Sequence, residues 1–133
     1  MKKLARYLEL IVDPTFDDFH VNRGSIRLAF LTSVTIYHSI DRVAEETGKR
    51  AARLRQLWCK ESTEFKIVDG LAHHFKHVES NAETHPRGPG IPIAHALGFG
   101  PNGLNLERRN LYFVLRDAIG FLRTKAQARA ATK

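Results

Sequence analysis

The chain has 133 residues, which fits a single helical domain over residues 1–133 and leaves no room for two domains of ordinary size. Its hydrophobic share of 43% and charged share of 26% are those of a globular protein and exclude a disordered chain. The single cysteine, Cys59, excludes an intrachain disulfide, and no segment has the roughly 18 consecutive apolar residues of a membrane span. We therefore expect a cytoplasmic protein with no membrane partner.

The net charge of +7 is unevenly distributed. Residues 49–60 and residues 107–133 each carry +5, and the rest of the chain is slightly acidic. Such asymmetry favours an acidic partner, of which nucleic acid is the most common.

The first half of the chain predicts two helices. Residues 2–12 place Leu4, Leu8 and Ile11 on one side, and Asp13-Pro14 is expected to end this helix. A long helix is predicted from about Ser25 to Thr47, with Gly48 as its C-terminal stop.

The second half predicts two or three more helices. A short basic segment covers residues 49–60, Ser62 or Thr63 caps a helix that ends near Glu79, and the last helix runs from about Asn105 to at least Arg123. Residues 85–106 hold five of the nine glycines and four of the five prolines, which predicts a Gly/Pro-rich arm or small β-hairpin before the last helix. The alanine-rich residues 126–133 are expected to fray. The predicted fold is mainly α, an antiparallel helical bundle of four to five helices.

Histidines mark the helix that begins near Thr63. Helical projection places Asp69, His73 and His77 together opposite its apolar face, with the two histidines four residues apart as metal ligands on a helix would be. These three residues are candidate ligands for a metal ion, and the histidines are also candidate catalytic groups. The alternative is a solvated polar face.

Asp41 falls within the predicted apolar face of the long helix, among Val34, Tyr37 and Ala44. An unpaired buried carboxylate is costly, and His38 lies three residues away, within reach of a hydrogen bond. We predict that Asp41 is mostly buried and paired. It is either a satisfied polar pair or a perturbed carboxylate in a catalytic site.

Two sets of arginines are candidate nucleic-acid contacts. Arg109, Arg116 and Arg123 recur every seven residues and form a basic stripe opposite the apolar face of the last helix. Arg53 belongs to the second basic segment, which surrounds Trp58. Arginine beside an aromatic ring suits phosphates and stacked bases.

Residues 65–77, with Val68-Asp69, Ala72 and Lys76-His77, resemble a helix found in small uncharacterised bacterial and phage proteins. The predicted helical architecture resembles the HEPN superfamily, which includes ribonucleases of toxin and antiphage systems and non-catalytic relatives. That resemblance implies a helical bundle and a function directed at RNA. The arginine and histidine signature of the family is not intact here, because Lys66 replaces arginine before His73 and no histidine follows Arg109-Asn110.

Three functions follow as hypotheses. The first is a nucleic-acid-associated helical protein, HEPN-like in architecture, that contacts phosphate through arginines. The second is a non-enzymatic homo-oligomeric interaction protein, and the third is a metal-binding helical protein.

Overall fold

The computed structural model describes residues 1–76 and 108–131, with side chains at residues 1–73 and 111–127. Within these ranges all secondary structure is helical, which confirms the predicted mainly α fold. The helices are α1 (Lys2–Tyr7), the π-helical turn η1 (Leu8–Val12), α2 (Asp13–His20), α3 (Ile26–Thr47), α4 (Ala51–Glu61), α5 (Thr63–Lys76) and α7 (Arg108–Ala131). The predicted Gly/Pro-rich arm at 85–106 lies outside the described residues.

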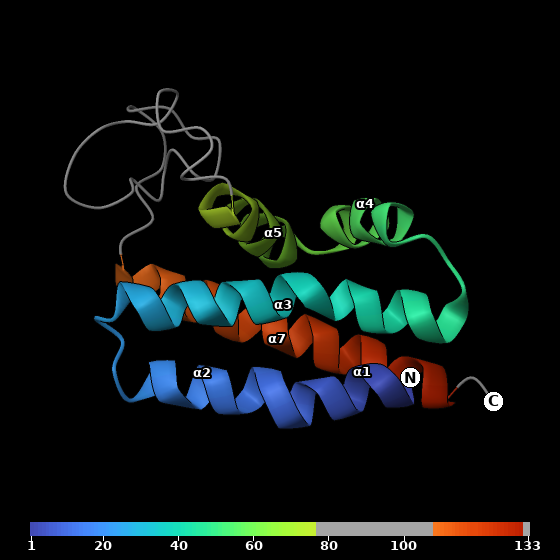
Figure 1. Ribbon diagram of the computed structural model, residues 1–133, viewed down its shortest axis with the longest axis horizontal. Helices are drawn as coiled ribbons and strands as arrows, with labels where there is room; N and C mark the ends of the chain where they lie inside the picture. The colour runs from blue at the N-terminus through green and yellow to red at the C-terminus, as the bar shows by residue number, and fades with distance from the viewer. Residues whose placement is uncertain (77–107, 132–133) are drawn as a thin grey trace.

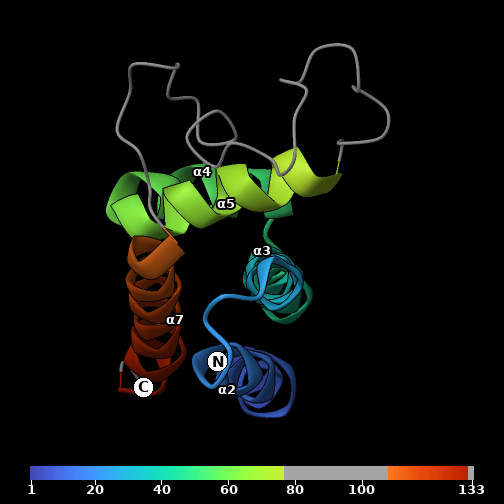
Figure 2. The same cartoon turned by 90° about the vertical axis from the view of Figure 1, so that its left-hand side faces the viewer.

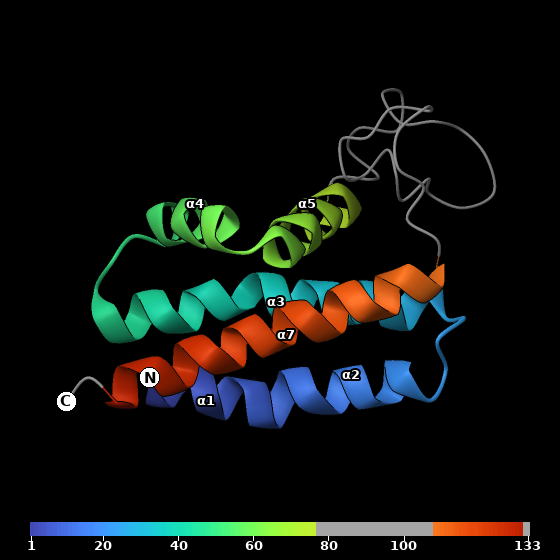
Figure 3. The same cartoon turned by 180° about the vertical axis from the view of Figure 1, so that it is seen from behind.

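The helices form three layers (Figure 1). α1, η1 and α2 make one long helix on one side, α3 and α7 lie in the middle, and α4 and α5 cover the opposite side. The long N-terminal helix runs antiparallel to α3, whereas α3 and α7 run in the same direction. Viewed along the bundle, α5 crosses over α3 and α7 at a steep angle (Figure 2), and the view from behind shows the full length of α7 (Figure 3).

The predicted ends of α3 and the start of α5 are confirmed by their caps. The Ser25 hydroxyl accepts a hydrogen bond from the Leu28 amide at 3.1 Å, which satisfies a free N–H of the first turn. Gly48 follows α3 with φ of +72°, a left-handed conformation that favours glycine. The Ser62 hydroxyl caps α5 by accepting from the Phe65 amide at 3.0 Å.

The predicted helix end at Asp13-Pro14 is wrong, because the chain passes through η1 into α2 without a break. Proline lacks an N–H and its ring clashes with the carbonyl four residues earlier in an α-helix. Here the Asp13 amide bonds to the Leu8 carbonyl, five residues back, and Pro14 occupies the tolerant first turn of α2. The Thr15 hydroxyl donates to the Ile11 carbonyl at 2.6 Å.

The π turn also changes which face of this helix is buried. Residues spaced by four drift by about 40° per step around an α-helix. The wider turn reverses this drift, so Leu4, Leu8 and Val12 are all buried in line, and Ile11, which was expected in the core, is exposed.

The predicted inner face of α3 is wrong by part of a turn. Val34, Tyr37 and Ala44 are only partly buried, and the side chain of Asp41 is 43% exposed rather than mostly buried. The buried residues are instead small or medium in size: Ala29, Thr32, Ser33, Ile36, Ser39, Ile40 and Val43. The three hydroxyls donate to carbonyls three or four residues earlier on the same helix, so they enter the core already hydrogen-bonded. Small side chains let α3 pack closely against α5 and α7.

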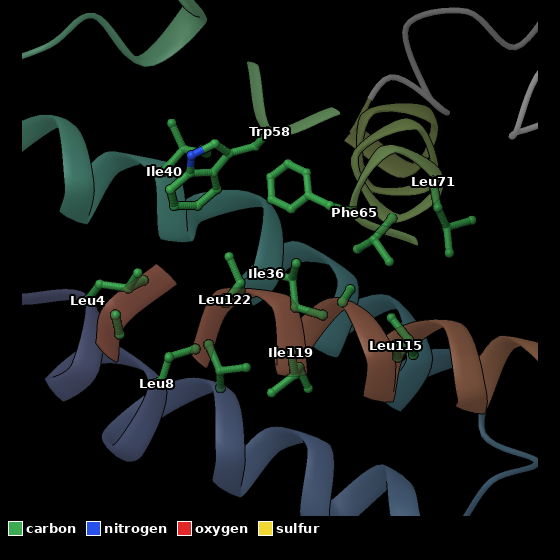
Figure 4. Close-up of a cluster of buried hydrophobic side chains, with 14 of the residues drawn as sticks. Leu4, Leu8, Ile36, Ile40, Trp58, Phe65, Leu71, Leu115, Ile119 and Leu122 are labelled. Atoms are coloured by element: carbon green, nitrogen blue, oxygen red, sulfur yellow. The ribbon is translucent and has the colours of Figure 1, made fainter. Parts of the chain in front are cut away.

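An aromatic cluster joins α4 and α5 to α7. The Trp58 ring meets Phe65 and Phe121 edge to face, with both centroid separations 5.7 Å. Figure 4 shows Trp58 and Phe65 above the aliphatic core that α3 and α7 share.

The last helix continues past the point where fraying was expected. It reaches Ala131, Ala126 is buried, and the Met1 ammonium donates to the Ala126 carbonyl at 2.8 Å. None of the described helices is long and apolar enough to span a bilayer.

Replacing Phe65 with alanine tests the aromatic cluster. We expect Phe65→Ala to lower the free energy of unfolding by about 3–5 kcal/mol, because it empties a fully buried site. Phe113→Ala is the matched control, since Phe113 is 45% exposed, and it should cost less than about 1 kcal/mol. Urea denaturation measures both variants, and equal losses would contradict the assigned core.

Candidate functional site

The predicted basic stripe on α7 is largely neutralised by carboxylates. An Arg123 Nη lies 2.7 Å from Asp13 Oδ1, and Arg116 Nε lies 3.1 Å from Asp117 Oδ1. Arg116 also rests over the Phe113 ring at 4.9 Å. The side chain of Arg109 lies outside the described residues. Two arginines of the stripe are therefore exposed but already engaged with carboxylates.

The cations of α4 and the start of α5 differ in this respect. In this part of the chain five cations have no ion-pair partner: Lys49, Arg50, Arg53, Lys60 and Lys66. All five are exposed. Elsewhere in the described chain, five cations face a carboxylate, as Lys125 faces Glu61 at 2.6 Å and Arg42 faces Glu45 at 3.5 Å. The four cations without such a partner there are Lys2, Arg6, Arg23 and Arg27, which are spread over residues 2–27. The excess positive charge of the described chain therefore gathers on the α4–α5 layer.

An open groove runs between α4 and α5, with a volume of about 960 Å³. Residues spaced by three or four on both helices line it: Ala52, Arg55, Gln56, Cys59, Lys60, Thr63, Lys66 and Asp69. Six of these eight residues are polar, and they include three cations and one carboxylate. Sequence reasoning missed Gln56 and Thr63, although the spacing of the polar residues along α4 contained the signal.

At the inner side of the groove, Arg55 is paired with Asp69. Arg55 Nε and Asp69 Oδ1 lie 3.1 Å apart, and neither atom makes an aligned hydrogen bond. The guanidinium also rests over the Tyr37 ring of α3 at 4.5 Å. Burial raises the pKa of Asp69 above its ordinary value, although the positive charge of Arg55 opposes this shift.

Two further groove features bear on the sequence predictions. Trp58 is buried, so it does not provide the exposed stacking surface expected beside Arg53. Burial also raises the pKa of the Cys59 thiol, with Asp69 adding to the effect, so this thiol stays protonated and unreactive at neutral pH.

The predicted metal ligands are only partly brought together. Asp69 lies in the groove beside Arg55, His73 is exposed one turn further along α5, and His77 lies outside the described residues. Within the described ranges no three His, Cys, Asp or Glu side chains are grouped to hold a metal ion. A guanidinium next to Asp69 also disfavours a second cation there.

The prediction for Asp41 is half right. His38 Nδ1 lies 3.0 Å from Asp41 Oδ2, which confirms the predicted pairing three residues apart. The pair lies at the surface of α3 and lines neither of the two grooves described here. The geometry therefore matches the satisfied polar pair.

The N-terminus of α4 carries positive charge where a helix favours negative charge. Arg50 is its N-cap residue and makes no side-chain capping bond, and no acidic residue lies in the first turn. Lys49, Arg50 and Arg53 therefore face the positive end of the helix dipole, an arrangement that typically costs about 0.3–1 kcal/mol per charge. A bound anion would remove this cost.

A second groove of about 390 Å³ lies where α1 and η1 meet α3. Leu10 and Ile11, turned outward by the π turn, are 54% and 44% exposed beside it. Tyr7 forms one wall, where burial raises its pKa to about 12 and its hydroxyl donates to the Thr35 carbonyl at 2.8 Å.

Comparison of the chain with models of protein families, with curated proteins and with solved structures finds no match.

Substitutions at position 50 test whether this residue can cap α4. Serine at position 50 supplies a side-chain acceptor, so we expect Arg50→Ser to be more stable than Arg50→Ala by about 0.5–2 kcal/mol. The two variants lose the same charge, which isolates the cap. Urea denaturation measures the difference, and equal stabilities would show that residue 50 does not cap α4.

The raised pKa of Asp69 predicts a pH-dependent stability. The folded state favours the neutral acid, so this group's contribution is fully present below its ordinary pKa of 3.8 and is lost as pH rises through the folded value. Asp69→Asn is always neutral, so wild type should lose stability relative to it as pH rises from about 3 to 7. Urea denaturation at several pH values measures this, and a relative gain by wild type would mean that Arg55 outweighs burial.

Proposed function

We propose that this protein associates with nucleic acid by contacting phosphates through the α4–α5 layer. The observation that carries the proposal is that exposed cations without carboxylate partners gather there, whereas Arg116 and Arg123 on α7 are ion-paired. Phosphates supply the missing negative charge, and each neutralised phosphate releases counterions. The uncapped, positively charged start of α4 gives the same surface a further preference for anions.

The groove favours contacts with the sugar-phosphate backbone of a nucleic acid over contacts with its bases. No aromatic residue is among those that line it, and Trp58 below it is covered, so bases have no ring to stack on. Lysines and arginines position a nucleic acid without reading its sequence. We therefore propose binding with little sequence preference, in the reducing cytoplasm that a lone, half-buried Cys59 fits.

The proposal does not assign a reaction. Lys66 and His73, the pair nearest to the HEPN signature, are seven residues apart on α5, two turns along one side of the helix. Asp41, another catalytic candidate, is on α3 and paired with His38, and the third candidate, His77, lies outside the described residues. Binding is the function that these positions support.

A second candidate function, a homo-oligomeric interaction protein, is favoured by exposed Leu10 and Ile11 beside the smaller groove. Sedimentation separates the two candidates. A stable dimer that binds no nucleic acid would favour this second function.

Salt dependence tests the leading proposal. In a triple variant with Arg53, Lys60 and Lys66 changed to glutamine, the slope of log affinity against log salt should flatten by about 2–3, because each phosphate contact contributes about 0.7–0.9. The matched control changes Arg109, Arg116 and Arg123 to glutamine and should flatten the slope less. Fluorescence anisotropy with RNA and DNA of unrelated sequences measures both variants.

Either of two results would contradict the proposal. One is no binding by wild type at about 50 mM salt, where electrostatic binding is strongest. The other is a larger loss in the α7 variant than in the α4–α5 variant, which would place the contacts on the stripe first predicted from the sequence.

A further inference from the structure

Arg55 is held differently from the other cations of the groove. Its side chain is 25% exposed, whereas Lys60 and Lys66 are exposed at the groove's rim. Tyr37 supports one face of the guanidinium, and Asp69 faces its Nε. Two contacts from two other helices therefore fix the orientation of this side chain.

This arrangement leaves the N–H donors on the two Nη atoms of Arg55 available to bind another anion. A guanidinium has five N–H donors, and those on its two Nη atoms can bind two oxygens of one phosphate at once. With Nε turned toward Asp69, the Nη atoms have no hydrogen-bond partner among the described residues. Gln56 and Thr63 line the same groove and supply an amide and a hydroxyl donor.

We propose that Arg55, with Lys60 and Lys66, forms a subsite for the terminal phosphate of a nucleic-acid strand. This inference rests on the proposed nucleic-acid function and names which group of the strand enters the groove. A terminal phosphate protrudes from the end of the chain and reaches a recessed guanidinium, whereas an internal phosphodiester is held back by chain on both sides. The three cations and Asp69 sum to +2, which matches the charge of about −1.5 to −2 on a phosphomonoester at neutral pH.

Asp69 is a positioning residue in this subsite. Its carboxylate, 3.1 Å from Nε, positions Arg55 by charge attraction and does not contact the phosphate in this arrangement. Because it cancels one of the groove's positive charges, it also weakens the binding of a phosphate dianion, so that the dianion can be released.

Three otherwise identical oligonucleotides test the inference, one with a 5′-phosphate, one with a 3′-phosphate and one with hydroxyls at both ends. With internally labelled strands in anisotropy measurements, wild type should bind at least one phosphorylated strand about tenfold more tightly than the hydroxyl-ended strand, equivalent to about 1.4 kcal/mol. Arg55→Lys keeps the charge but loses the paired donors, and it should remove this difference. Arg27→Lys, the matched control at an exposed arginine of α3 outside the groove lining, should keep it.

Thermal unfolding checks that each variant folds. If Arg55→Lys does not fold, Lys66→Gln carries the same test, because it changes an exposed position at the rim and should reduce the difference. Binding of free phosphate is tested separately, by adding inorganic phosphate to ¹⁵N-labelled protein at constant ionic strength. Saturable changes in the NMR chemical shifts of groove amides in wild type, absent in the Arg55 variant, support the subsite.

The outcomes separate this inference from the proposed function. Equal affinity for all three strands, with strong salt dependence, overturns the terminal-phosphate subsite and leaves nucleic-acid association intact. If no strand binds and inorganic phosphate still shifts the groove amides, the groove binds phosphate, but both the nucleic-acid function and the assignment of the groove to a strand terminus fail. If no strand binds and phosphate causes no shift, both fail.

Discussion

The edge-to-face packing of Trp58 against Phe65 and Phe121 holds the outer helical layer on the bundle, and the proposed site depends on it. Each of the three rings comes from a different helix, so the contact fixes α4 and α5 relative to α7. Because the apolar sides of α4 and α5 turn inward to this cluster, their polar residues turn outward and face one another. The groove is thus a direct product of how the outer layer is anchored.

The same packing of the outer layer also determines which cations have carboxylate partners. Carboxylates of the N-terminal helix and α3 lie close enough to reach cations of neighbouring elements, as Asp13 reaches Arg123. The outer layer has three described carboxylates of its own against six cations, and two of the three, Asp69 and Glu61, are already paired with Arg55 and Lys125. A chain of modest net charge therefore presents one strongly basic side.

Local signals allowed the helix ends to be predicted, whereas tertiary features were not predictable from the sequence. Ser25, Gly48 and Ser62 act within one helical turn of their own positions, so the sequence was enough to place those ends. The face of α3 was misjudged because large apolar residues were weighted above Thr32 and Ser33, whose hydroxyls are satisfied by their own helix. The contact between Arg55 and Asp69 depends on how two helices cross, and their spacing of fourteen residues carries no signal of it.

The π turn at Leu8–Val12 amounts to one extra residue accommodated inside a helix without a loop. A homologue that lacked this residue would keep the same bundle with an ordinary α-helix, and its sequence would align with this one only through a gap in the middle of a helix. Alignment methods penalise such gaps heavily. Register across the N-terminal helix is therefore best compared from the buried series Leu4, Leu8, Val12 and Phe19 rather than by counting residues from Met1.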